Sequence, residues 1–403
     1  MDAATNPFAP GAGTQPPELT GRETNLESAR VTILRIKNGL HARSLILVGL
    51  RGVGKTVLLN RIKTMAENEG YLTASIESPE DASLGSLLAG PLRQMLLQLD
   101  GQANVKQKIH DAMTALRNFA ATFKITIGDI GISVNKAGVA DSGILANDLI
   151  DLLVAVGEAA KESKTSVAFF IDELQYVSEK ELGYLIGALH RISQMNLPFV
   201  VFGAGLPQIA GLTGKAKSYA ERLFDFQTID RLSNSASEKA IKEPMERQNV
   251  GISNEALRAI IETTEGYPYF LQEWGKHTWD VAESSPIQNS DVTSAYDSAI
   301  AALDQAFFRV RFDRLTPSEK EYLRAMAELG PGPHRSGDIA TKLNRRVDQV
   351  APTRANIISK GMVYAPAYGD NAFTVPKFDE YLKRVMPEFI PTPVRARPKQ
   401  RRR

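Results

Sequence analysis

The sequence of 403 residues contains no cysteine, which excludes disulfide bonds, zinc ribbons, iron–sulfur clusters and thiol nucleophiles. Such a composition suits a reducing compartment, and we expect a cytoplasmic protein. No apolar run approaches the roughly 20 residues that cross a bilayer, so we expect no membrane partner. Five scattered histidines lack the spacing of a metal site. The length predicts two or three domains.

The sequence also lacks a large net charge: basic and acidic residues nearly balance, and the formal net charge is +2. Residues 391–403 nevertheless carry six of the 48 basic residues and no acid. We expect this basic tail to be disordered, since it has little to bury. It is either a solubilising end or an arm that binds phosphates, and the sequence leaves both open.

Short apolar runs alternate with helical patterns, which predicts an α/β fold: a five-stranded parallel sheet with helices on both faces. The expected strands are Ser44–Val48, Tyr71–Ile76, Ser166–Ile171, Phe199–Phe202 and Phe224–Ile229. Between the second and third strands, helical patterns at Leu84–Leu99 and Leu145–Ala160 flank an alternating stretch. That stretch predicts an inserted β-hairpin at about 123–135, which we expect to be packed rather than to grip a partner.

Changes of pattern divide the chain into five parts. We expect a flexible leader at 1–20, an α/β nucleotide-binding domain at 21–232, a helical lid at 233–302, a winged helix–turn–helix at 303–390 and the tail at 391–403. In the lid, Ser253 is a predicted N-cap and Pro268 starts a helix. Thr316 and Glu319 form a capping box that opens the last domain. Three helices followed by two extended runs are typical of a winged helix.

The strongest motif is the sequence GLRGVGKT at residues 49–56, which fits the P-loop pattern with a strand before it and a helix after it. Its backbone N–H groups would surround the phosphates of ATP or ADP, aided by the helix N-terminus. Lys55 would reach the β- and γ-phosphates, and the Thr56 hydroxyl would ligate Mg²⁺. The predicted nucleotide-binding residues here are Gly49, Gly52, Val53, Gly54, Lys55, Thr56 and Val57.

A second motif ends the third predicted strand, where the apolar run Val167–Ile171 is followed by Asp172 and Glu173. A buried strand that delivers Asp172 to its carboxyl end would place a carboxylate beside the metal. Glu173 could then polarise the attacking water as a general base. Such an ending is common by itself, and the P-loop makes it specific.

Together these residues resemble an AAA+ P-loop ATPase. The Thr-Gly-Arg-Glu element at residues 20–23, the P-loop, the acid pair and the helical lid are similar to the origin-recognition-complex-like and archaeal-ATPase group and to the related STAND signalling ATPases. The resemblance covers about residues 15–390. It implies that Gly21 and Arg22 lie near the adenine and that Pro268 contacts the nucleotide from the lid. It also implies that Arg222 acts as an arginine finger on a neighbouring subunit of a homo-oligomer; a surface arginine is the alternative.

Two departures from the family pattern concern the rate of hydrolysis. No polar residue follows the fourth strand in residues 203–207, and the lid helix 268–282 has no arginine at the position of a second sensor. We therefore expect a slow ATPase that works as a switch rather than as a motor.

The winged helix suggests two outputs for that switch. Basic residues near its second and third helices favour DNA binding, and the candidates are Arg345, Arg346, Arg354 and Lys360. The alternative is a STAND-like regulator, in which the winged helix holds an ADP-bound monomer and ATP permits assembly with a protein partner. A small-molecule kinase is disfavoured, because no acceptor site is evident.

Overall fold

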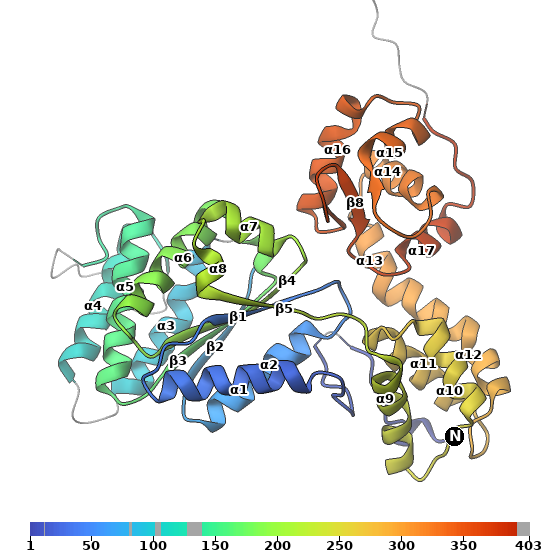
Figure 1. Ribbon diagram of the computed structural model, residues 1–403, viewed down its shortest axis with the longest axis horizontal. Coiled ribbons are helices and arrows are strands. Elements are labelled where there is room, and N and C mark those ends of the chain that lie inside the picture. Colours follow the sequence, from blue (N-terminus) through green and yellow to red (C-terminus); the bar gives the residue numbers. More distant parts are fainter. Residues whose placement is uncertain (12, 80–82, 101–105, 127–138, 393–403) are drawn as a thin grey trace, which may run out of the picture.

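The computed structural model describes residues 1–11, 13–79, 83–100, 106–126 and 139–392 (Figure 1). The predicted fold class is confirmed: five parallel strands form a sheet in the order β2-β3-β4-β1-β5. The strands are β1 (Ser44–Val48), β2 (Leu72–Glu77), β3 (Val167–Asp172), β4 (Phe199–Gly205) and β5 (Phe224–Thr228). They match the predicted runs to within one residue, except that β4 continues to Gly205.

Alternating residues of the sheet pack on two different layers of helices, as a doubly covered sheet requires. Leu45 and Leu47 pack with α1 (Glu23–Lys37) and α2 (Lys55–Asn68), whereas Ile46 between them packs on the opposite face. The second layer contains α3 (Leu84–Asp100), α4 (Lys106–Thr122), α5 (Leu145–Glu162), α6 (Glu179–Gln194), α7 (Ile209–Ala216) and α8 (Ala220–Leu223) (Figure 1).

The insertion between β2 and β3 differs from its prediction. Helix α4 was not predicted, although Ile109, Ala112, Leu116 and Phe119 are buried at helical spacing. The hairpin expected at about 123–135 is not present in its first residues, which form a turn and coil after α4. The rest of it, residues 127–138, lies outside the described residues.

The lid contains α9 (Asn234–Arg247), α10 (Asn254–Thr264), α11 (Pro268–Val281) and α12 (Asn289–Ala302). The Ser253 side chain accepts a hydrogen bond from the Ala256 N–H, and Pro268 is the first residue of α11, so both end signals are confirmed. Within the described residues, no helix of the lid or of any other part is long and apolar enough to cross a membrane.

The lid runs without a break into the C-terminal winged helix. Helix α12 continues as the π-helical η3 (Leu303–Phe308) and then as α13 (Arg309–Phe312). The winged helix follows, with α14 (Pro317–Glu328), α15 (Ser336–Lys342), α16 (Val347–Ser359), α17 (Phe378–Val385) and a three-stranded sheet of β6 (His334–Arg335), β8 (Asp370–Phe373) and β7 (Val363–Tyr364). The capping box of Thr316 and Glu319 opens α14 as predicted. Lid and winged helix share one hydrophobic cluster, so they form one packed body.

The leader is not the flexible segment that its composition predicted. Phe8 is buried in the lid cluster with 3% of its surface exposed. The Trp279 indole N–H donates to the Asp2 carbonyl at 3.0 Å, and the Asn6 amide donates to the Lys276 carbonyl at 3.0 Å. One buried aromatic ring and these directed bonds offset the chain entropy that made the segment look disordered. The basic tail lies outside the described residues from residue 393 onward.

We expect Phe8→Ala to lower the free energy of unfolding by about 3 kcal/mol, because it removes a buried ring from the lid core. Chemical denaturation measures this value, and Ala4→Ser on the exposed turn at residues 3–5 is the control. An unchanged midpoint for Phe8→Ala would show that the leader does not pack on the lid in solution.

Candidate functional site

The P-loop joins the carboxyl end of β1 to the first turn of α2. Gly52 and Gly54 have φ angles of +80° and +90°, in the left-handed region that glycine enters without strain. Gly49 is required for another reason: a Cβ at this position would lie 2.1 Å from the Ile229 carbonyl oxygen. These glycines let the loop curl at the N-terminus of α2, where backbone N–H groups and the helix dipole favour an anion.

Lys55 lies inside this loop. Its Nζ donates to the carbonyl oxygens of Gly49 at 3.0 Å and Leu50 at 2.8 Å. Desolvation lowers the pKa of Lys55 to about 8, against the opposing effect of the carboxylates of Glu173 and Asp172. A phosphate at this position would offer the ammonium group a charged acceptor in place of neutral carbonyls.

Thr56 and Asp172 meet as the sequence predicted. The Thr56 hydroxyl donates to Asp172 Oδ2 at 2.6 Å, and desolvation raises the pKa of the Asp172 carboxyl. Among the described residues, no cluster of three or more His, Asp or Glu side chains could hold a metal by itself. Mg²⁺ is usually held by one or two carboxylates together with substrate phosphates, so this hydroxyl and carboxylate fit a nucleotide-bound Mg²⁺.

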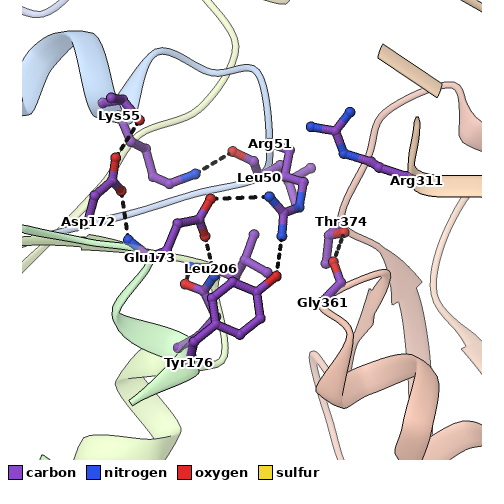
Figure 2. A network of polar contacts seen from close by, with 12 residues as sticks. Leu50, Arg51, Lys55, Asp172, Glu173, Tyr176, Leu206, Arg311, Gly361 and Thr374 are labelled. Carbon is purple, nitrogen blue, oxygen red and sulfur yellow. Dashed lines mark hydrogen bonds and ion pairs between the residues drawn. The ribbon is translucent and has the colours of Figure 1, made fainter. Parts of the chain in front are cut away.

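Glu173 follows Asp172 in a left-handed conformation with φ of +53°. Its Oε1 accepts from Arg51 Nη1 at 3.2 Å, and its Oε2 accepts from the Gln175 side-chain amide (Figure 2). Arg51 also donates through Nη2 to the Tyr176 hydroxyl at 2.8 Å. Each carboxylate oxygen therefore already accepts one hydrogen bond, and Arg51 would compete with a water molecule for Oε1.

The lid closes the site from the other side, together with η3 and α13, which form the linker between the lid and the winged helix. The Tyr269 N–H donates to the Gly52 carbonyl at 3.3 Å, which joins the start of α11 to the P-loop. The rings of Tyr269 and Phe307 stack with centroids 4.7 Å apart. Pro268 lines the same cavity, and its contact with the nucleotide stays a prediction.

The cavity enclosed by these groups measures about 720 Å³, within the range of sites that hold nucleotide-sized ligands. Its walls come from the leader, the P-loop, the ends of β2 and β3, the lid and the linker. Residues that line it include Gly13, Thr14, Glu18, Thr20, Arg22, Arg51, Gly52, Val53, Gly54, Lys55, Thr56, Val57, Asp172, Glu173, Pro268, Gln272, Phe307 and Arg311.

The resemblance implied that Gly21 and Arg22 lie near the adenine, but only Arg22 lines the cavity. Arg22 lines the cavity, but its guanidinium donates to the Val53 carbonyl at 3.1 Å and to the Asp230 carbonyl at 2.5 Å. Burial lowers the pKa of Arg22. Gly21 does not line the cavity; its Cα faces Ala236 of the lid. Arg22 thus holds the P-loop against the segment after β5.

Arg222 is exposed on α8, just before β5. Because Phe224 pairs with Ser44, this end of β5 lies at the amino edge of the sheet, opposite the P-loop. Arg222 does not line the cavity of its own chain. A role on the nucleotide of a neighbouring subunit stays a prediction.

The predicted DNA-binding residues are mostly engaged within the winged helix. Arg345 pairs with Glu321 at 2.9 Å, and Lys360 pairs with Glu319 at 2.7 Å. Arg354 donates to the Asn371 side chain at 2.6 Å and to the Asp370 carbonyl at 3.0 Å. Arg346 is the exposed member of the set, with 78% of its side chain accessible, and it pairs with Asp348. Three of the four side chains therefore hold the domain together.

Several residues of the site were missed by sequence reasoning. Arg51 is an unconstrained position of the P-loop pattern, and Gln175 lies two residues beyond the acid pair. Arg311 and the leader reach the cavity only through tertiary folding. An arginine inside a P-loop next to an acid pair was the one visible signal.

Residues 18–202, which include the P-loop and the acid pair, match the family described as an AAA ATPase domain. The chain contains an AAA ATPase domain. Residues 305–382 match a family described only as a domain of unknown function. The resemblance to AAA+ ATPases is thereby confirmed.

Proteins similar to this chain match it over most of its length. An uncharacterized HTH-type transcriptional regulator of Methanocaldococcus jannaschii is 22% identical over 344 residues, which are 81% of this chain and 79% of the relative. The Walker-type ATPase PABY2304 of Pyrococcus abyssi has the same fold, with a TM-score of 0.56 at 16% identity over 92% of this chain and 97% of that one. The Aeropyrum pernix ORC1 protein in complex with DNA gives a TM-score of 0.44 at 12% identity, covering 91% and 93% of the two chains.

We expect Lys55→Ala to weaken binding of Mg²⁺-ATP by roughly thirtyfold or more, because a charged hydrogen bond contributes about 2 kcal/mol. Isothermal calorimetry measures this change. Lys63→Ala, further along α2, is the matched control, since Lys63 pairs only with Glu67. Equal affinity for the wild type and Lys55→Ala would refute the assignment of the phosphate site.

Proposed function

We propose that this AAA ATPase binds ATP with Mg²⁺, hydrolyses it slowly and uses the nucleotide state to control its winged helix. One observation carries the proposal: the backbone N–H of Arg51, inside the P-loop, donates to the Thr374 carbonyl of the winged helix at 2.9 Å. The loop that would surround the phosphates is thereby joined directly to the C-terminal domain.

The contact is wider than one hydrogen bond. A Cβ at Gly361 of the winged helix would come within 3.1 Å of the Arg51 guanidinium and the Tyr176 hydroxyl, so these groups pack closely (Figure 2). On the lid side, Lys377 pairs with Glu265 at 3.1 Å. The winged helix thus contacts both the P-loop and the lid, and closure or opening of the lid would change the position of the winged helix.

Hydrolysis would depend on the acid pair. Asp172 would hold Mg²⁺ with Thr56, and Glu173 would orient the attacking water once Arg51 releases it. The hydrogen bond between Arg51 and Glu173 involves two partly buried charged groups and is worth about 1.5–3 kcal/mol. A bound phosphate would offer Arg51 a charged acceptor in place of Glu173, which would offset this loss. The need to break it supports slow turnover.

We expect Glu173→Gln to keep Mg²⁺-ATP affinity within about threefold and to lower single-turnover hydrolysis by roughly 10²-fold or more, the usual contribution of a general base. Calorimetry and a phosphate-release assay measure the two quantities. Glu179→Gln, on the exposed start of α6, is the control. Normal turnover by Glu173→Gln would remove the base assignment.

For the output of the switch, the charge distribution favours the STAND-like alternative, in which the winged helix is a regulatory module. Ion pairs occupy Arg345 and Lys360, and the fully exposed wing tip carries Tyr368 rather than a basic residue. DNA binding is the second candidate. The name of the Methanocaldococcus jannaschii relative, an HTH-type transcriptional regulator, and the exposed Arg346 favour it. Assembly of a homo-oligomer through Arg222 belongs to either candidate.

We expect ATP to move the winged helix relative to the sheet. Because the chain has no cysteine, Tyr368→Cys on the wing and Lys180→Cys on α6 can be spin-labelled without further changes. The interspin distance distribution measured with a slowly hydrolysed ATP analogue should differ from that with ADP. Adding Lys55→Ala to the labelled protein is the control and should abolish the difference. Identical distributions for the two nucleotides would contradict the switch.

Duplex DNA separates the two outputs with the same labelled protein. If the winged helix is a regulatory module, DNA at low salt neither binds measurably nor alters the distance. Salt-dependent binding that Arg346→Glu weakens would instead establish the second candidate.

A further inference from the structure

Beside the nucleotide cavity, Arg311 is a cation that forms no ion pair with any carboxylate in the described part of the chain. It lies on α13, in the continuous helical run that leads from the lid to the winged helix. Its guanidinium lines the cavity and packs on the Phe307 ring, with Cζ 4.5 Å from the ring centroid. In Figure 2 the side chain extends from its helix toward the P-loop and Arg51.

The other lining cations have more partners within the protein, although Arg51 Nε is buried without one. Lys55 donates to two backbone carbonyls and Arg22 to three, and Arg51 is paired with Glu173. Arg311 donates to the Phe307 carbonyl alone, and none of the described carboxylates forms an ion pair with it. Within this wall, Arg311 is the cation whose donors remain available for a ligand.

Its surroundings make this unpaired charge unfavourable. Burial is the main cause that lowers the pKa of Arg311 to about 10, and the positive charge of Arg51 adds to it. A guanidinium has five donors in a planar fork that matches phosphate oxygens. A phosphate group in the cavity would satisfy these donors and neutralise the charge of Arg311, which the described carboxylates leave without an ion pair.

We propose that Arg311 binds the terminal phosphate of ATP and is the residue by which this chain distinguishes ATP from ADP. The inference rests on the proposed function, because it requires the nucleotide in this cavity. The sequence showed no arginine at the position of a second sensor, because α11 carries none. Arg311 of α13 lines the cavity and could take that role from the linker.

Binding of a phosphate by Arg311 would also affect the winged helix, because Arg311 lies on the helical run that leads into it. Residues 289–312 are helical throughout, and the π-helical η3 immediately precedes α13. Segments of π-helix are rare and frequently occur at functional sites. A phosphate held by Arg311 would fix the end of this helical run, which leads directly into the winged helix. ADP lacks that phosphate and would leave the run unrestrained.

The test compares two nucleotides on four proteins: the wild type and three variants. Calorimetry with Mg²⁺ and the β,γ-imido analogue of ATP should show roughly tenfold or greater weakening for Arg311→Gln, because a charged hydrogen bond is lost. Affinity for ADP should stay within about twofold, which also reports that the variant is folded. Arg311→Lys, which keeps the charge, should recover part of the affinity for the analogue. Arg309→Gln, an exposed arginine of the same helix that pairs with Asp313, should match the wild type.

A second measurement uses the spin-labelled pair at residues 180 and 368. Arg311→Gln should give the ADP-type distance distribution with either nucleotide at saturation. Equal weakening of both nucleotides, or no weakening of either, would overturn the inference. A wild-type protein that binds neither nucleotide would instead overturn the proposed function, so the two failures are distinguishable.

Discussion

The hydrogen bond between Thr56 and Asp172 depends on one constraint, which is the parallel register of β1, β4 and β3. β4 lies between the other two, and all three strands run in the same direction. Their carboxyl ends therefore meet at one edge, and the loop after β1 faces the acids after β3 across a single strand. A slip of one residue in β3 would turn Asp172 toward the opposite face and separate it from Thr56. The packing of alternate residues on two helical layers makes such a slip costly, because each strand is buried on both faces.

Arg51 connects the chemistry at this edge with the rest of the molecule. Its side chain joins Glu173 and Tyr176, while its backbone N–H joins the winged helix. Loss of one partner of a buried ion pair is costly, because the remaining charge is left uncompensated. A phosphate could replace Glu173 as the partner of Arg51, so the guanidinium would stay paired when the carboxylate is released. The same residue is therefore well suited to respond to a ligand.

The sequence predicted those features that depend on local pattern. Strands buried on both faces, the P-loop, the acid pair and the capping box at Thr316 each follow from spacing or residue type within a few positions. Features that depend on tertiary contact were missed or wrong. The leader looks disordered by composition, yet Phe8 fills a place in the lid core. The arginines of the winged helix look like a basic surface until Glu319 and Glu321 of α14 are seen to pair with them.

The basic residues of the winged helix are paired with carboxylates, whereas some cations at the nucleotide cavity are not. In the winged helix, carboxylates on α14 lie within ion-pair distance of the basic residues, so the domain can retain those charges without a ligand. At the cavity, Asp172 accepts a hydrogen bond from the Thr56 hydroxyl, and Glu173 accepts hydrogen bonds from Arg51 and Gln175. These two carboxylates therefore form no ion pair with Lys55 or Arg311. The donors of Lys55 are directed at neutral carbonyls, and those of Arg311 are largely unused. A polyanion is the ligand class that would supply the most acceptors for these donors. Arg311 would gain the most hydrogen bonds from it, and Arg311 lies on the helix that leads into the winged helix.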